Sequence, residues 1–452
     1  MARLRRRAAA WFALFAALPA IAAIAATVTA TATMAAPPVA PPPVQAPVPQ
    51  QAQQAQQLLQ PLQPLQPLID AATPGATLRL APGRYQGPAI IRRPLTLDGG
   101  GAAQIVGDGR GTVLSVRADG VTLRALRITG SGDSQDRIDA AVWLQGSAHT
   151  VEQLDIDDAL FGLHLQGVSG SVVRASRVRG KALPPGLRGD ALRLWNSRHN
   201  RIEDNVFTRG RDITLINSPD NALSRNRFDD GRYGLHAVFS PRLHAEGNRL
   251  ERTGTGIVVL YSPQLTLRGN HVAHALTDGG AGIVIKESDD ATVVGNEVLH
   301  CAVGMKLDTP VQGRGRLLVR GNRFAHNIVG LFFYGEAGSG RFEDNRFEHN
   351  LTTVAISAAG AGSAHRWSGN QWDEYQGLDL DRDRVGDTAH EVLLFADRIW
   401  MEQPMTTFFR NSPALELLDF LERLAPFSAP VRVLLDPRPR MPGTTWNKES
   451  LP

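Results

Sequence analysis

A short phrase that recurs along most of the chain is the strongest constraint on its fold. Each copy has a Gly or Asp corner, three or four alternating residues, often a Ser, and a second short strand that ends at an Asn. The recurring asparagines follow one another at intervals of 21 to 26 residues: Asn205, Asn226, Asn248, Asn270, Asn296, Asn322, Asn345 and Asn370. Self-similarity at such a period is the signature of a solenoid or a related repeat architecture.

The alternation within each copy predicts which side chains face inward. Residues one position after each corner are apolar, and a period of two places them on the same face as the residues two further on. The first of these rows contains Leu163, Leu192, Ile213, Leu235, Ile257, Ile283, Met305 and Leu331. One coil cannot bury its apolar face alone, whereas stacked coils share a core. Blades of about 40 residues, as in propellers, do not fit this period, and neither does the leucine spacing of leucine-rich repeats.

The predicted fold is therefore all-β: a single-stranded, right-handed parallel β-helix of about eleven or twelve coils, with a short C-terminal helical cap or tail. We expect four segments: a signal peptide over residues 1–36, a Pro/Gln-rich linker over 37–68, β-helix repeats over 69–375, and a C-terminal module over 376–452. The first segment has arginines, an apolar run and small residues in the order of a secretory signal. A permanent membrane anchor is the alternative, because the apolar run is long enough to span a bilayer.

Composition excludes two classes of protein. One cysteine, Cys301, permits no intramolecular disulfide, so stability must come from core burial. Arg3, Arg5, Arg6 and Arg7 account for the formal net charge of +4, and the other 44 basic residues balance 44 acidic ones. A balanced body does not favour a nucleic-acid partner, which needs a basic excess.

A carbohydrate-active β-helix enzyme, whether lyase, epimerase or hydrolase, is the alternative function. Glycoside hydrolysis uses two carboxylates at a defined separation. The acidic pairs Asp157-Asp158, Asp229-Asp230 and Asp289-Asp290 lie at expected turns, where aspartate is common for backbone reasons. Outward aromatic residues are scattered rather than arranged in a row.

Four histidines recur at one position of successive coils. His274, His300, His326 and His349 each come four residues after a repeat asparagine, so stacking places them one above another at a corner. Imidazoles at the spacing of paired strands can bind a soft or borderline metal or titrate as a group. The alternative is a solvated corner that accepts any polar residue, because earlier coils have Arg209, Asp230 and Arg252 there.

Two further places offer soft ligands. His236 is expected to face outward beside Phe239 and Tyr261. Cys301 and Met305 supply a thiol and a thioether, which suit Cu(I), although both fall at inward positions where a core role is more common.

The repeat stops after Asn370. The alternating aspartates of residues 379–387 could form a Ca²⁺ turn, but Arg384 and His390 replace the Gly and Glu of an EF-hand loop. Ser412 is expected to cap a helix that begins at Pro413. Its apolar stripe, Leu417, Leu418, Leu421 and Leu424, either covers the open end of the solenoid or docks on a membrane partner.

Several phrases of this chain resemble the NosD family. They are the first-coil segment 72–85, Gly231-Arg232-Tyr233-Gly234-Leu235-His236, Tyr261-Ser262, Gly369-Asn370-Gln371-Trp372, the 379–387 run, Ser412-Pro413-Ala414 and Asp436-Pro437-Arg438-Pro439-Arg440-Met441. The resemblance covers about residues 69 to 442. The methionines that this family often carries after Gly-Leu-His are absent here, while His236 is retained.

The resemblance implies a non-catalytic periplasmic accessory protein in maturation of the copper–sulfur centre of nitrous oxide reductase. Its implied partners are an ABC transporter with permease NosY and ATPase NosF, the copper lipoprotein NosL and the reductase. Contact with the membrane would then run only through the permease. Copper is the implied cofactor or cargo, with His236, the four corner histidines and Met305 as the candidate ligands.

Overall fold

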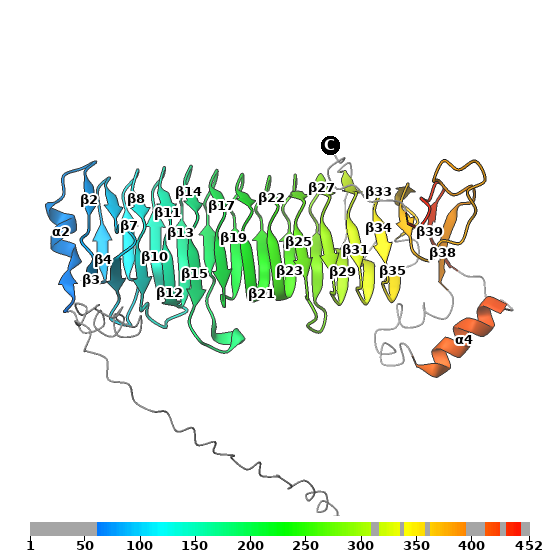
Figure 1. The fold of residues 1–452 in the computed structure, drawn as a ribbon, viewed down its shortest axis with the longest axis horizontal. Coiled ribbons are helices and arrows are strands. Elements are labelled where there is room, and N and C mark those ends of the chain that lie inside the picture. The colour runs from blue at the N-terminus through cyan, green and yellow to red at the C-terminus, as the bar shows by residue number, and fades with distance from the viewer. Residues whose placement is uncertain are drawn as a thin grey trace, which may run out of the picture. The chain divides into compact units, whose positions relative to one another are not determined.

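Successive coils of the chain stack side by side as a parallel β-solenoid (Figure 1). The computed structural model describes residues 61–308, 316–334, 339–357, 362–394, 412–424 and 431–443. The expected signal peptide (1–36) and most of the expected linker (37–60) lie outside the described residues. The predicted parallel β-helix is confirmed.

One side of the solenoid is a 13-stranded parallel sheet with one strand for each coil. Its strands are β2 (Thr77–Arg79), β5 (Thr96–Asp98), β8 (Thr122–Arg124), β11 (Thr150–Glu152), β14 (Val172–Arg174), β17 (Arg201–Glu203), β20 (Ala222–Ser224), β22 (His244–Glu246), β24 (Thr266–Arg268), β27 (Ala291–Val294), β30 (Leu317–Arg320), β33 (Gly340–Glu343) and β36 (Arg366–Ser368). The sequence predicted eleven or twelve coils; the coil that contains β5 was not identified as a repeat because it has no asparagine at its corner.

The other strands of the solenoid form a 24-stranded sheet made of two rows, apart from the two-stranded sheet of β38 and β39. The first row follows the asparagine corner: β1 (Gln63–Pro64), β3 (Gly83–Gln86), β6 (Ala103–Val106), β9 (Arg127–Thr129), β12 (Asp155–Ala159), β15 (Arg177–Gly180), β18 (Val206–Thr208), β25 (His271–Ala273), β28 (Glu297–Leu299), β31 (Arg323–Ala325), β34 (Arg346–Glu348) and β37 (Gln371–Trp372). The second row comes after the next corner: β4 (Ala89–Ile91), β7 (Leu114–Arg117), β10 (Ala140–Gln145), β13 (Phe161–Gln166), β16 (Leu192–Trp195), β19 (Asp212–Ile216), β26 (Ala281–Lys286), β29 (Val303–Asp308), β32 (Val329–Tyr334) and β35 (Thr352–Ile356). The 12-residue strands β21 (Arg227–Val238) and β23 (Arg249–Leu260) run through both rows.

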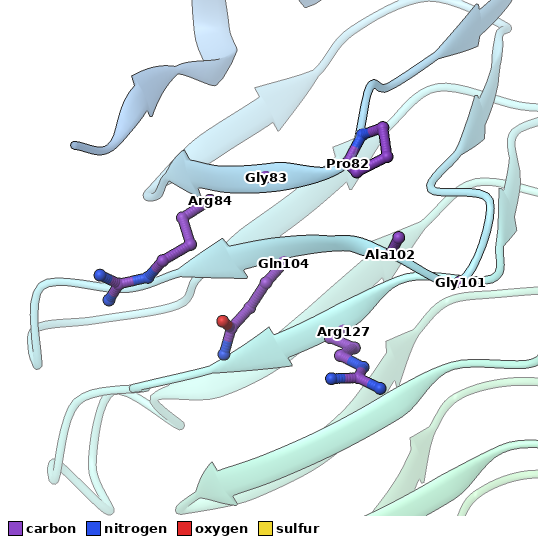
Figure 2. A pocket seen from close by; sticks show the side chains of 7 residues that line it. All are labelled: Pro82, Gly83, Arg84, Gly101, Ala102, Gln104 and Arg127. Atoms are coloured by element: carbon purple, nitrogen blue, oxygen red, sulfur yellow. The ribbon is translucent and has the colours of Figure 1, made fainter. Parts of the chain in front are cut away.

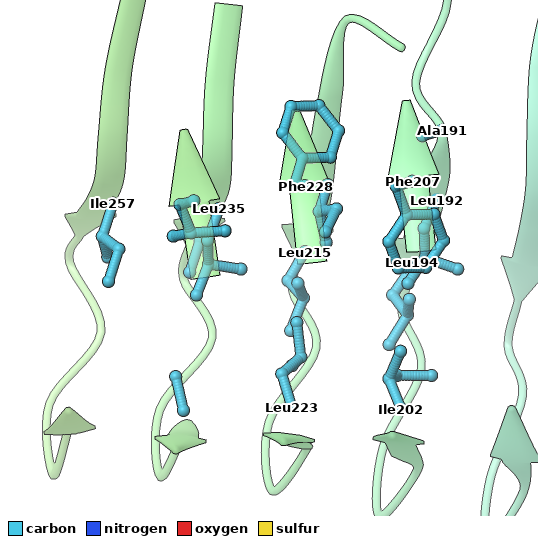
Figure 3. Close-up of a cluster of buried hydrophobic side chains, with 14 of the residues drawn as sticks. Ala191, Leu192, Leu194, Ile202, Phe207, Leu215, Leu223, Phe228, Leu235 and Ile257 are labelled. Atoms are coloured by element: carbon cyan, nitrogen blue, oxygen red, sulfur yellow. The ribbon is translucent and has the colours of Figure 1, made fainter. Parts of the chain in front are cut away.

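The predicted inward rows form one continuous core. Leucine, isoleucine and phenylalanine side chains of successive rungs lie over one another, as Leu194 and Leu215 do on adjacent rungs in Figure 3. Met305 is fully buried among them. Each rung therefore buries its apolar face only against its neighbours, which is why the fold needs many rungs.

A ladder of amides holds the asparagine corner together. Each recurring asparagine after Asn205 accepts, on its Oδ1, the backbone N–H and the Nδ2–H of the asparagine one rung earlier. Asn226, for example, donates to Asn248 Oδ1 from N at 3.0 Å and from Nδ2 at 3.1 Å. Its Nδ2 also donates to the carbonyl oxygen of Ile202 at 2.7 Å. The corner thus satisfies backbone groups that the turn would leave buried without partners.

A short helix closes the N-terminal end of the core. Helix α2 (Leu65–Ala71) buries Leu65 and Ile69 on the first rungs. The Gln66 side chain takes the place of a neighbouring strand beside β4, since its Oε1 accepts the backbone N–H of Ile90 at 2.7 Å. The folded body therefore begins several residues before position 69, within the expected linker.

The opposite end is closed by a strand rather than by the predicted helix. Strands β38 (His390–Leu394) and β39 (Val431–Asp436) pair antiparallel, and Val433 and Leu434 of β39 are buried in the common core. Helix α4 (Pro413–Leu424) is present, as predicted. However, Leu417, Leu421 and Leu424 are 57%, 46% and 67% exposed, so the interpretation of this helix as the cap is corrected. No helix among the described residues is long and apolar enough to cross a bilayer.

Candidate functional site

The four predicted corner histidines form a stacked column on the solenoid surface. Ring centroids lie 5.3 Å apart for His274 and His300, 5.1 Å for His300 and His326, and 5.1 Å for His326 and His349. The first two pairs are nearly parallel, at 6° and 10°, and the last pair is tilted by 34°. All four side chains are exposed.

The backbone explains why the column is regular. Each of the four residues has a positive φ, between 51° and 61°, as do Arg209, Asp230 and Arg252 in earlier rungs. The corner is therefore a left-handed turn in these seven rungs, and histidine is among the residues that adopt this conformation more readily than most. Backbone N–H groups of this corner donate to the next rung, as His300 does to the Ala325 carbonyl at 3.2 Å.

Charged side chains flank the column. His271 Nδ1 lies 2.8 Å from Glu297 Oε2, and Arg323 bridges Glu297 and Glu348 at 2.7 Å each. Slight burial, together with His326, His274 and Arg323, lowers the pKa of His300. The middle of the column therefore favours neutral imidazole, the form that coordinates metals.

His236 lies on a different column. It occupies the outward face of β21, in register with Thr214 and Val258, and its ring centroid lies 5.0 Å from that of Tyr233. Burial lowers its pKa, and the Asp212 carboxylate opposes this effect. The exposed rings of Phe239 and Tyr261 stack on each other at 5.1 Å at the corner after this strand.

The two sulfur candidates are buried in the core. Met305 has no exposed surface, and Cys301 Sγ lies 3.2 Å from the carbonyl oxygen of Leu299. Burial raises the pKa of the Cys301 thiol to about 11, so it is protonated at neutral pH. The structure therefore does not bring these atoms together with the surface histidines.

The acidic turn does bring three carboxylates together. Ligand atoms of Asp379, Asp381 and Asp383 lie within 4.8 Å of one another. Backbone N–H groups already donate to this cluster: Asp383 N and Arg384 N reach the Asp379 carboxylate at 3.1 and 3.0 Å. Local hydrogen bonds account for the turn.

Sequence reasoning missed two features. One is a pocket of about 200 Å³ on the N-terminal rungs, whose lining is Pro82, Gly83, Arg84, Gly101, Ala102, Gln104 and Arg127 (Figure 2). The other is a buried ionic network around Asp190 and Asp212 on the second row. Both carboxylates lie at corners of adjacent rungs, and their separation by one repeat period could have indicated that they are neighbours.

Solved structures that resemble the solenoid include an epimerase and a polygalacturonase. The A-module of mannuronan C-5 epimerase AlgE4 from Azotobacter vinelandii is similar with a TM-score of 0.49 and 15% identity, over 64% of this chain and 92% of that one. A family 28 exopolygalacturonase from Yersinia enterocolitica has a TM-score of 0.43 and 11% identity, over 70% and 73%. At these identities the likeness concerns the fold alone.

Sequence relatives are more specific. Residues 168–377 match the family model described as "Periplasmic copper-binding protein (NosD)". The "Probable ABC transporter binding protein NosD" of Pseudomonas aeruginosa is 30% identical over 385 residues, 77% of this chain and 84% of that protein. The protein of the same name from Stutzerimonas stutzeri is 28% identical over 389 residues, 77% and 83%. The matches span the solenoid coils whose corners carry the amide ladder and the histidine column, and the chain belongs to the NosD family.

Proposed function

We propose that this protein is a non-catalytic periplasmic accessory protein that receives, passes or scaffolds copper during assembly of the copper–sulfur centre of nitrous oxide reductase. It acts with the ABC transporter permease and ATPase (NosY and NosF) and with the copper lipoprotein NosL. The family description as periplasmic and copper-binding, and the names of the relatives as ABC transporter binding proteins, support this assignment.

The observation that carries the proposal is the column of His274, His300, His326 and His349. Two imidazole nitrogens that share a metal at about 2 Å each must approach to about 4 Å. Centroid spacings of 5.1 to 5.3 Å allow this after a modest tilt, and His326 and His349 are already tilted by 34°. Imidazole suits copper, and an exposed row of equivalent ligands favours transfer from one position to the next over permanent storage.

His236 is a second candidate ligand, on the outward face of the second row in register with Thr214. It is half-buried, which favours the neutral ring, and the exposed aromatic pair Phe239 and Tyr261 lies at the following corner. Met305 has no role as a ligand in this proposal, because reaching it requires opening the core.

A Cu(I) competition assay with a coloured chelator tests direct binding. The quadruple variant should replace the four corner histidines by asparagine, because asparagine also accepts the positive φ of this corner. We expect the wild-type protein to retain Cu(I) and the quadruple variant to lose at least tenfold in affinity, with a smaller loss for His236→Ala. His199→Asn is the matched control, since His199 is an exposed histidine with a φ of 56° at another corner.

The outcome separates two versions of the proposal. If the wild-type protein does not compete for Cu(I), direct carriage is refuted and only a scaffolding role stands. If the quadruple variant binds as tightly as the wild type, the histidine column is not the site.

The exposed stripe of α4 is the proposed contact with the transporter. Leu417, Leu421 and Leu424 are exposed together with Phe420, which the sequence pattern did not single out, while Leu418 is half-buried. We expect Leu417→Asp with Leu421→Asp to abolish co-purification with the detergent-solubilised NosFY transporter without changing the melting temperature. Leu351→Asp, at an equally exposed leucine of the solenoid, should leave co-purification intact; retention by the double variant would place the contact elsewhere.

A further inference from the structure

One outward-facing column of the second row consists of polar and aromatic side chains that are largely buried. Strand register places Trp143, His164, Arg193, Thr214 and His236 on five successive rungs, in β10, β13, β16, β19 and β21. Their strand neighbours, such as Leu163 and Leu165, point into the core, so these five point away from it. Rungs about 4.8 Å apart make the column continuous over about 19 Å.

Four of these side chains have polar atoms that the structure leaves without partners. Within the described part of the chain, Trp143 Nε1, His164 Nδ1, Arg193 Nε and Thr214 Oγ1 are out of contact with solvent and have no hydrogen-bond partner. A buried polar group without a partner loses its bonds to water and gains nothing in return. Such groups are rare in folded proteins, and four on consecutive rungs indicate that something outside the chain completes them.

An ionic network borders the same column. The buried Asp190 carboxylate lies 3.2 Å from Arg193 Nη1 and 2.8 Å from Arg211 Nη2. The buried Asp212 carboxylate is paired with Arg232 and accepts the backbone N–H of Tyr233 at 3.0 Å. Three arginines face two carboxylates, so the network keeps a positive excess. Burial and the nearby Asp212 raise the pKa of Asp190, while Arg211 and Arg193 oppose this effect.

Two side chains of the column, Trp143 and Arg193, are only partly buried. His164 is 2% and Thr214 is 4% exposed, whereas Trp143 and Arg193 are half-buried. The indole of Trp143 packs edge-on against the His164 ring at 4.9 Å, and the Arg193 guanidinium lies 5.2 Å over the Trp195 ring. Rotation of these two side chains, a change that commonly accompanies binding, exposes the polar atoms beneath.

We propose that the column Trp143, His164, Arg193 and Thr214 binds a small oxygen-rich anion of the carboxylate, phosphate or sulfate type. An indole N–H and a guanidinium Nε–H are donors only, so the missing partner must be an acceptor. The acceptors on the chain, Asp190 and Asp212, are already paired with the arginines. The positive excess supplies the charge preference, and charge-assisted hydrogen bonds of this kind are the strong ones. This site does not include the histidine column; it adjoins His236 on the next rung and goes beyond the proposed function.

The experiment follows the indole resonance of Trp143 in the full chain labelled with ¹⁵N-tryptophan, assigned by its loss in Trp143→Phe. Acetate, inorganic phosphate, sulfate and D-glucuronate are titrated to about 50 mM at constant ionic strength against chloride, a range that reaches millimolar affinities. We expect a saturable shift with at least one of these anions. Arg193→Gln should weaken binding at least tenfold, while Arg198→Gln, at an exposed arginine, should not change it.

Each outcome bears on the proposal. Saturation by phosphate or sulfate assigns an inorganic oxyanion, and saturation by acetate or glucuronate alone assigns an organic acid; both support the site. The absence of a saturable shift with all four anions overturns it, since water then completes the column. Equal affinity in wild-type protein and Arg193→Gln also overturns it. Thr214→Val, which keeps the shape of the side chain, provides a second test if Arg193→Gln does not fold.

Discussion

At the residue scale, the hydrogen-bonding capacity of the asparagine side chain explains both why asparagine recurs in the ladder and why the ladder ends at an aspartate. An asparagine inside the ladder must accept on Oδ1 and donate from Nδ2, which only an amide does in this geometry. The last position of the ladder has no rung after it, and Asp436 occupies it: its Oδ2 accepts Asn370 N at 3.0 Å, Asn370 Nδ2 at 2.9 Å and Trp372 Nε1 at 3.3 Å. A carboxylate suits this position because only donors converge on it.

Asn248→Asp should therefore destabilise the protein. Asn248 Nδ2 donates to the Leu223 carbonyl and to Asn270 Oδ1, both at 2.9 Å. Replacing that group by a carboxylate oxygen sets acceptors against each other in a buried corner, and we expect a loss of about 2–4 kcal/mol in the free energy of unfolding. Urea denaturation at neutral pH measures it. Asn217→Asp, at an exposed corner, should stay within about 0.5 kcal/mol of the wild type; an equal loss there would contradict the ladder argument.

Two buried histidines predict a pH dependence of the C-terminal rungs. Burial lowers the pKa of His365 and of His390 to about 4. In the unfolded chain both titrate near 6.5, so the unfolded state binds more protons between these values. Stability is therefore fully present above about pH 6.5 and is lost as the pH falls toward 4. His365 sits against the Phe333 ring at 4.6 Å, and neither of its ring nitrogens has a partner among the described residues.

Hydrogen exchange of β33 and β36 at pH 7 and pH 5 measures this effect. We expect faster exchange at the lower pH after correction for the intrinsic rate, and His365→Phe should remove part of the difference because phenylalanine cannot take up a proton. Strands near the N-terminal end, such as β2 and β5, serve as the internal control. Equal acid sensitivity at both ends would show that these histidines are not its cause.

At the element scale, the two ends of the solenoid are closed by unrelated devices. Helix α2 contributes Leu65 and Ile69 at one end, and strand β39 contributes Val433, Leu434 and the ladder-terminating Asp436 at the other. The periodicity of the coils contains no information about either device, because each occurs once. An amphipathic stripe predicted α4 correctly, yet a stripe alone does not distinguish a core partner from a foreign one.

Substitutions in β39 and α4 should therefore differ in their effects. Val433→Asp buries a charge in the core and should cost about 3 kcal/mol or more. Leu421→Asp lies on an exposed stripe and should change stability by no more than about 0.5 kcal/mol. Thermal melts of the two variants provide the measurement. A large loss for Leu421→Asp with little loss for Val433→Asp would restore the helix as the cap.

At the scale of the whole molecule, features that recur at a regular spacing in the sequence were predictable. Features that depend on how coils of unequal length align with one another were not. Regular spacing after each asparagine was enough to predict the histidine column, whose rings do stack. The column of Trp143, His164, Arg193 and Thr214 lies in coils of unequal length, so the sequence alone does not align it. Strand register was needed to make neighbours of His164 and Arg193, which are far apart in the sequence.

A solenoid stabilised mainly by contacts between adjacent rungs should tolerate removal of one whole coil. Deleting residues 249–270 joins Asn248 to His271 and preserves both the amide ladder and the inward rows, because Arg249 and His271 are equivalent in register. We expect a folded protein with β-rich circular dichroism and a melting temperature close to the wild type. Deleting the half-coil 260–270 instead sets a strand where a corner belongs, so it should yield no cooperative melt. If both deletions behave alike, stability does not reside in rung-to-rung register.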